Sequence, residues 1–105
     1  MELVINQPKV RVEIPNNIAY LHEFKGQNIS NKTIRLVNSH KGCSCTGIHC
    51  PETILPHENF VVTMVVDKIG QTGLFSVGAS LEFDNEEKIK LNINGKLYEP
   101  ESESF

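Results

Sequence analysis

The residues with the most chemistry lie in one short stretch near the middle of the chain. Its centre is the segment Gly42-Cys43-Ser44-Cys45-Thr46-Gly47. Cysteine thiolates and imidazoles are the ligands that tetrahedral zinc prefers, so this stretch could hold a metal. The candidate ligands are Cys43, Cys45, Cys50 and His49. A structural zinc site usually takes cysteines in pairs that are two to four residues apart, whereas Cys43 and Cys45 are closer together and on a strand would face opposite sides.

The three cysteines could instead form a disulfide or serve only in packing. A bridge between Cys43 and Cys45 would be strained, so Cys50 with either of them is the best geometric pair. In a reducing cytoplasm, cysteines more often serve as small apolar side chains at a corner of a sandwich. We predict this last role and therefore no metal site and no cofactor, with zinc and a disulfide as open alternatives.

Catalysis by Cys43 would need a histidine within hydrogen-bond reach, a third group to orient that histidine, and donors for the developing oxyanion. Histidines lie nearby in the sequence, but no orienting residue or glycine-rich donor loop is recognisable. Paired-carboxylate and phosphate-loop signatures are also missing from the sequence. We predict that the protein is not an enzyme, has no catalytic residues and takes no small-molecule substrate.

The charge and hydropathy of the chain exclude two further classes of partner. The 105 residues carry a net charge of -3 and no basic stripe, which argues against binding to nucleic acid. No apolar run reaches the length needed to cross a membrane, and residues 1–6 lack the basic start and apolar stretch of a secretory signal. We therefore expect a soluble protein that is made and assembled in a cytoplasm.

Apolar residues recur with a period of two, which is typical of β-strands. Segments of this kind are expected at 10–14, 18–24, 33–37, 60–66, 75–83 and 88–94, and the last two should form a hairpin. Turn signals separate them and no helical period is sustained. The pattern predicts one all-β domain over residues 1–98, a seven-stranded antiparallel sandwich of immunoglobulin type, with an acidic, serine-rich tail at 99–105.

The in-phase apolar positions predict the core of this sandwich. They are Phe24, Leu36, Val62, Met64, Phe75, Val77, Leu81, Ile89 and Leu91. The segment 60–66 is apolar in both phases, so it should be covered on both sides or present Val61 and Val65 to a partner.

Motifs spread over most of the chain, about residues 20–98, carry a resemblance to a bacterial family of unknown function that typically shows a Cys-Gly-Cys-Thr segment. They are Phe24, Leu36-Val37-Asn38, Cys43-Ser44-Cys45-Thr46, Ile54-Leu55-Pro56-His57-Glu58-Asn59, Met64-Val65-Val66-Asp67, Gly73-Leu74-Phe75 and Ile93-Asn94-Gly95. Ser44 and His57 stand where that family has glycine. The family is similar to hydin-type and major-sperm-protein-like immunoglobulin-like domains, and the resemblance implies a sandwich used for protein contacts.

A small domain of this type also resembles the accessory immunoglobulin-like proteins that phages place on heads, necks and tails. We therefore expect a structural subunit of a virion assembled in the host cytoplasm, whose partners are other protein subunits. A cytoplasmic scaffolding or chaperone-like binding domain is the second expectation, and a structural zinc or redox module the third. The residues expected to make the contacts are Leu3, Val4, Ile5, Val61, Val65 and Phe105.

Overall fold

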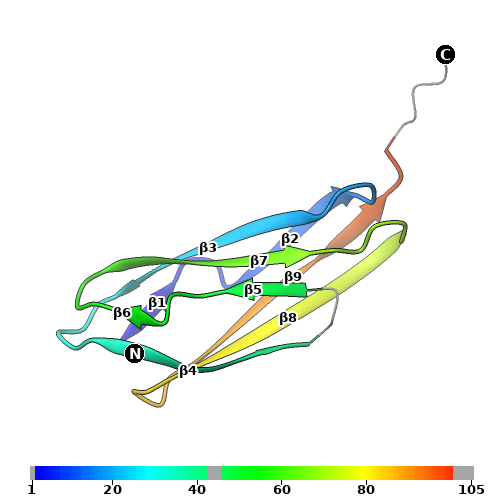
Figure 1. Ribbon diagram of the computed structural model, residues 1–105. Helices are drawn as coiled ribbons and strands as arrows, with labels where there is room; N and C mark the ends of the chain where they lie inside the picture. Colours follow the sequence, from blue (N-terminus) through cyan, green and yellow to red (C-terminus); the bar gives the residue numbers. More distant parts are fainter. Residues whose placement is uncertain (1, 43–45, 101–105) are drawn as a thin grey trace.

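The chain forms two β-sheets that pack on each other, and the computed structural model describes residues 2–42 and 46–100 (Figure 1). Within these residues there are nine strands and no helix. The strands are β1 (Leu3–Ile5), β2 (Lys9–Pro15), β3 (Tyr20–Asn28), β4 (Ile34–Lys41), β5 (Thr46–His49), β6 (Thr53–Ile54), β7 (Asn59–Val66), β8 (Gly73–Phe83) and β9 (Lys88–Tyr98). The expected all-β sandwich is confirmed, but it has nine strands rather than seven.

The two sheets differ in size and in strand direction. One has four strands in the order β1-β3-β7-β5, and the other has five in the order β2-β9-β8-β4-β6. Neighbouring strands are antiparallel except β2 and β9, which run parallel from Lys9 beside Asn92 to Pro15 beside Tyr98. The expectation of a purely antiparallel sandwich is therefore wrong at this edge. Because β2 and β9 come from distant parts of the chain, no local turn fixes their relative direction.

Three strands were not expected from the sequence: β1, β5 and β6. They lie beside two of the places where the chain passes from one sheet to the other. The chain crosses between sheets after β1, near Pro8, and after β5, near Pro51. Proline cannot donate a hydrogen bond to a strand ladder, so it suits these crossings. The strands around them, β1, β5 and β6, have only three, four and two residues. Segments this short do not show a recognisable period of two.

The core lies between the sheets and is aliphatic with a few phenylalanines. Of the nine predicted core residues, eight are buried, while Leu36 is half-buried at a bulge in β4. Buried positions alternate along β7, β8 and β9, as the sequence pattern predicted. The expected hairpin is formed by β8 and β9, which pair from Gly73 beside Leu97 to Glu82 beside Lys88.

Gly95 marks the closest approach of two strands. A Cβ at this position would lie 1.7 Å from the carbonyl oxygen of Val12 and 2.7 Å from its carbonyl carbon. Both atoms belong to backbone, which cannot move aside without displacing β2 from β9. Glycine is therefore required at the end of the Ile93-Asn94-Gly95 segment for the parallel pair to form.

A fully buried amide joins the loops at one end of the sandwich. Asn28 Nδ2 donates to the carbonyl oxygens of Lys32 at 2.7 Å and Leu55 at 3.1 Å. Its Oδ1 accepts from the backbone N–H of Ser30 at 2.9 Å and from the Ser30 hydroxyl at 2.7 Å. All the polar atoms of the side chain are thus satisfied, as a buried amide requires.

The first strand is fastened to the β8–β9 turn through carboxylates. The Glu87 carboxylate accepts hydrogen bonds from the backbone N–H groups of Glu2 and Leu3. Glu2 in turn accepts from Asn85 Nδ2 at 3.1 Å and lies 3.5 Å from Lys32 Nζ. The hydrogen bond from Asn85 is the largest cause that lowers the pKa of Glu2, and the positive charge of Lys32 acts in the same direction. β1 is therefore an integral part of the domain.

Candidate interaction surfaces

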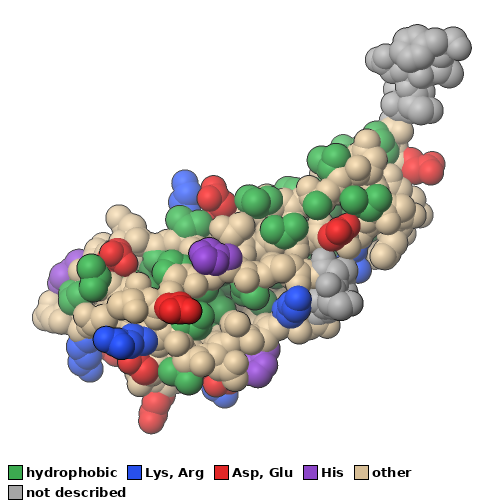
Figure 2. Space-filling model, in the orientation of Figure 1, with side chains coloured by type: hydrophobic (Ala, Val, Ile, Leu, Met, Phe, Trp, Pro, Cys, Tyr) green, Lys and Arg blue, Asp and Glu red, His purple; other side chains and the backbone are tan. Residues whose placement is uncertain are grey.

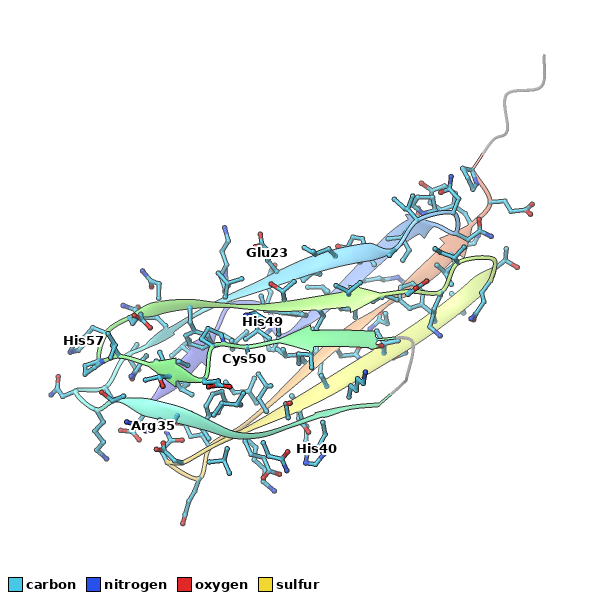
Figure 3. The ribbon with its side chains drawn as sticks, viewed as in Figure 1. Glu23, Arg35, His40, His49, Cys50 and His57 are labelled. Carbon is cyan, nitrogen blue, oxygen red and sulfur yellow. The ribbon has the colours of Figure 1, made fainter. Side chains whose placement is uncertain are left out.

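The two zinc candidates that the structure describes, Cys50 and His49, differ in burial. Cys50 is buried in the core and its thiol donates to the carbonyl oxygen of Pro51 at 3.4 Å. Burial raises the pKa of this thiol to about 11. His49 is exposed on the outer side of β5 (Figure 3). Cys43 and Cys45 lie outside the described residues, and among those described no group of three or more histidine, cysteine or acidic side chains could hold a metal.

The predicted contact residues of β1 have three different environments. Leu3 is 2% exposed and packs in the core, so its inclusion among the surface contacts is corrected. The reason is that β1 pairs with β3 and turns Leu3 inward, beside Asn28. Val4 faces outward and is 46% exposed, and Ile5 is half-buried.

The other predicted contact residues lie farther along the chain. Val61 and Val65 point outward from β7, where Val61 is exposed and Val65 is half-buried. They are flanked by Lys25 and Leu21 of β3, respectively. Phe105 lies outside the described residues. Of the six contact residues predicted from the sequence, Val4 and Val61 are the ones whose described side chains are exposed.

A group of exposed apolar side chains that the sequence reasoning missed lies at one end of the sandwich. We call it the apolar end, and it consists of Ile18, Leu21, Ile69, Leu74 and Tyr98. It lies where β2, β7 and β9 end and β3 and β8 begin. Leu74 is 81% exposed and the other four are exposed as well. Figure 2 shows hydrophobic side chains gathered over this end of the molecule.

Backbone hydrogen bonds hold the loops of the apolar end together. Gly70 N–H donates to the carbonyl oxygen of Asn16 at 2.9 Å, which joins the β7–β8 loop to the β2–β3 turn. Asn16 N–H donates to the carbonyl oxygen of Tyr98, also at 2.9 Å. The loops that carry Ile18 and Ile69 are therefore fixed relative to each other and to the end of β9. The apolar pattern placed Ile18 in a strand expected at 18–24, but β3 begins only at Tyr20. Ile69 lies in a turn, where an isolated apolar residue follows no period.

The structure shows no described helix that is long and apolar enough to cross a membrane. One surface hollow among the described residues has a volume of about 510 Å³ and is lined by residues of β4 and β6 with the nearby Glu52. Arg35 and Glu52 are its charged groups, and its remaining lining residues are Leu36, Val37, Asn38, Ser39 and Thr53. Cys50 and Glu2, the two groups with shifted pKa values among residues 2–42 and 46–100, do not line this hollow.

Comparisons with known proteins place the chain by sequence and by fold. Residues 7–97 match the family model described as "Protein of unknown function (DUF1573)". No curated protein matches the chain. Among solved structures, the chain is similar to the ASH / PapD-like domain 7 of human CEP192, with a TM-score of 0.76 and 8% identity, over 95% of this chain and 87% of that one.

Two further structures contain the same fold within longer chains. A protein of unknown function from Porphyromonas gingivalis W83 has a TM-score of 0.71 and 8% identity, over 90% of this chain and 46% of that one. The VesB protease of Vibrio cholerae has a TM-score of 0.66 and 10% identity, over 91% of this chain and 31% of that one. At these identities the likeness shows an immunoglobulin-like, PapD-like sandwich and no shared activity.

Proposed function

Because the chain belongs to the DUF1573 family, whose function is unknown, we propose its role from its surfaces: it is a non-enzymatic module that binds other proteins. The observation that carries this proposal is the apolar end, where five large side chains are exposed, two in turns and three at the ends of strands, around loops that hydrogen bonds hold together. Exposed apolar groups that cluster on a folded domain mark protein contacts more often than chemistry. Leu21 faces outward from the four-stranded sheet, whereas Leu74 and Tyr98 face outward from the five-stranded sheet. The partner therefore covers the end of the sandwich, and burying these side chains there removes apolar surface from water.

The fold supports the same proposal. The human CEP192 neighbour is a domain of similar size, whereas the chain spans less than a third of the VesB protease. The protease activity belongs to that longer chain and is not carried over to this one. The feature that the chain shares with these neighbours is a sandwich whose loops and strand edges are available for contact with other proteins.

The residues that resemble the Cys-Gly-Cys-Thr family include two whose geometry supports that finer assignment. His57 stands where that family has glycine, and its φ of 61° lies in the left-handed region that glycine favours. Gly95 stands at the family's closing glycine, where no side chain fits. We infer that the DUF1573 match and this resemblance describe the same family.

Two substitutions at the apolar end test the proposed function. Leu74→Asp and Ile69→Asp should each reduce the amount of copurifying partner at least about tenfold, because hot-spot side chains carry most of the binding free energy. Both side chains are exposed, so the melting temperature should change little. Val37→Asp is the matched control, since Val37 is 64% exposed but lies in β4 toward the other end.

The effect of each substitution is measured as the affinity for one identified partner. The protein most enriched with the tagged chain is identified by mass spectrometry, purified and titrated against each variant. Equal affinities for wild type, Leu74→Asp and Ile69→Asp would contradict a role for the apolar end. A loss with Val37→Asp alone would move the contact to β4.

The nature of the assembly is a separate question. A virion subunit should sediment with particles, a cytoplasmic scaffold with cellular proteins, and a zinc module should carry one metal per chain. The virion role stays a prediction from the sequence, and none of the relatives named above is described as a virion protein. Sedimentation of the tagged chain from its source therefore decides between the first two.

A further inference from the structure

β2 offers the longest free edge of the sandwich. Each sheet ends in two edge strands: β1 and β5 in one, β2 and β6 in the other. β2 has seven residues, whereas the other three have two to four. Its inner neighbour is β9, and no described strand pairs with its outer side. A free strand edge is a template for pairing with another strand.

The two ends of the β2–β9 pair show which backbone groups face outward. Pro8 accepts a hydrogen bond from Asn92 N–H, and Asn16 N–H donates to Tyr98, both at 2.9 Å. Residues of a strand alternate in the direction of their backbone groups, so the even-numbered residues of β2 bond to β9. The N–H and C=O groups of Lys9, Arg11 and Glu13 therefore face away from β9.

We propose that β2 pairs in antiparallel fashion with β2 of a second copy of this chain, about a two-fold axis at Val12. Val12 is the midpoint of Lys9–Pro15, so this register pairs the whole strand with its copy. Arg11 then lies opposite Glu13 of the second copy, and Glu13 opposite Arg11 of that copy. Both pairs have outward-facing backbone groups, so each exchanges two hydrogen bonds.

The charges of β2 select this register. Arg11 and Glu13 are exposed, and the ion pairs within the described residues, Lys32–Glu2 and Lys88–Glu82, involve neither of them. Centring the pair on Arg11 would place Arg11 against its own copy. Centring it on Val10 would place Lys9 against Arg11. The register about Val12 alone gives two opposite-charge pairs and no like-charge pair.

The inner face of β2 agrees with the same register. Val10 and Val12 face the core but are only half-buried, because nothing described covers this edge. In the proposed pair Val12 meets Val12 of the second copy, and Val10 meets the buried Ile14 of that copy. Apolar side chains therefore meet on one face and opposite charges on the other, as the pleat of a sheet requires.

Charged residues on an edge strand usually prevent it from pairing with other strands. Arg11 and Glu13 likewise oppose pairing of β2 with any strand that lacks the complementary charges. A two-fold contact uses the same surface on both copies, so it closes at two subunits. Pro15 lacks an N–H and Pro8 precedes the strand, which limits the pairing to the length of β2. This inference goes beyond the proposed function, because β2 and the apolar end are different surfaces.

Exchange of charges provides the test. Sedimentation equilibrium of the whole chain should show a concentration-dependent dimer. Arg11→Glu and Glu13→Arg should each weaken it at least about tenfold, because each places like charges opposite one another twice. A mixture of the two variants should restore a one-to-one dimer, as should the double variant R11E/E13R. Lys90→Glu, which makes the same change of charge as Arg11→Glu at an exposed side chain of β9, is the control and should have no effect.

Hydrogen exchange gives a second readout that follows the alternation. In the dimer the amides of Arg11 and Glu13 should become protected, whereas those of Val10 and Val12 should be protected at every concentration. A wild-type chain that stays monomeric up to about 1 mM, or a dimer that R11E does not weaken, would overturn the proposal. So would a different protein that occupies the edge of a monomeric chain.

Discussion

At Gly95 the backbone of a neighbouring strand occupies the place of a side chain. Gly95→Ala should lower the free energy of unfolding by about 3 kcal/mol or more, because the new methyl group meets the carbonyl of Val12 and must separate β2 from β9. Gly47→Ala is the control, since the nearest atom to its Cβ would be Val65 Cβ at 3.8 Å, an ordinary contact. Urea denaturation of both variants measures the difference. Equal midpoints would show that β2 can move away from β9 without a loss in the free energy of unfolding.

Cys50 should be a slow nucleophile. Burial raises its pKa to about 11 from a usual 9.0, so roughly a hundredfold less thiolate is present near pH 8 than in the unfolded chain. In a background with Cys43→Ser and Cys45→Ser, a thiol reagent should therefore label the folded protein at least about a hundredfold more slowly than the urea-unfolded protein. The folded rate should increase with pH up to about 11. Equal rates in the two states would show that Cys50 is accessible and ionised.

Some properties of single residues could be predicted from the sequence and others could not. The positions of the buried core residues followed from alternation, and His57 was marked because it stands where the family that the sequence resembles has glycine. The burial of Leu3 and the hydrogen bonds of Asn28 depend on segments that meet only after folding. A pattern read along the chain carries no information about such distant partners.

Among the strands, β8 is the clearest test of the core because it lies between β9 and β4 in the larger sheet. Leu81 in β8 is fully buried, so Leu81→Ala should cost about 2–5 kcal/mol of stability. Val37→Ala, at an exposed position of β4, should change stability by less than about 0.5 kcal/mol. Thermal and urea unfolding measure both. A Leu81→Ala effect as small as that of Val37→Ala would remove Leu81 from the core.

The length of a strand determined whether it could be predicted. β7, β8 and β9 have eight or eleven residues, and their alternation identified both the strands and their buried faces. β1, β5 and β6 take their conformation from the strands beside them rather than from their own pattern. The parallel direction of β2 was missed for a related reason, because the chain between it and β9 contains all the other long strands.

For the whole molecule, periodicity predicted the all-β class and the family resemblance implied a role in protein contacts, but neither located the surfaces. The apolar end is assembled from turns and strand ends that are far apart in sequence; the hydrogen bond from Gly70 N–H to the carbonyl oxygen of Asn16, for example, joins the loop of Ile69 to the turn of Ile18. The β2 edge becomes visible only when the order of strands is known. Both proposals therefore rest on the three-dimensional arrangement and are tested separately.

The parallel pairing of β2 and β9 also determines how the domain responds to mechanical force. The chain enters β2 at Lys9 and leaves β9 at Tyr98, at opposite ends of the pair. Tension between Glu2 and Pro100 should therefore slide the two strands past each other and load their hydrogen bonds together. Tension between Gln71 and Glu99 should instead peel β8 from β9 one bond at a time, because Gly73 and Leu97 are neighbours. Single-molecule pulling should thus give a higher unfolding force for the first attachment than for the second, and the reverse order would show that another contact carries the load.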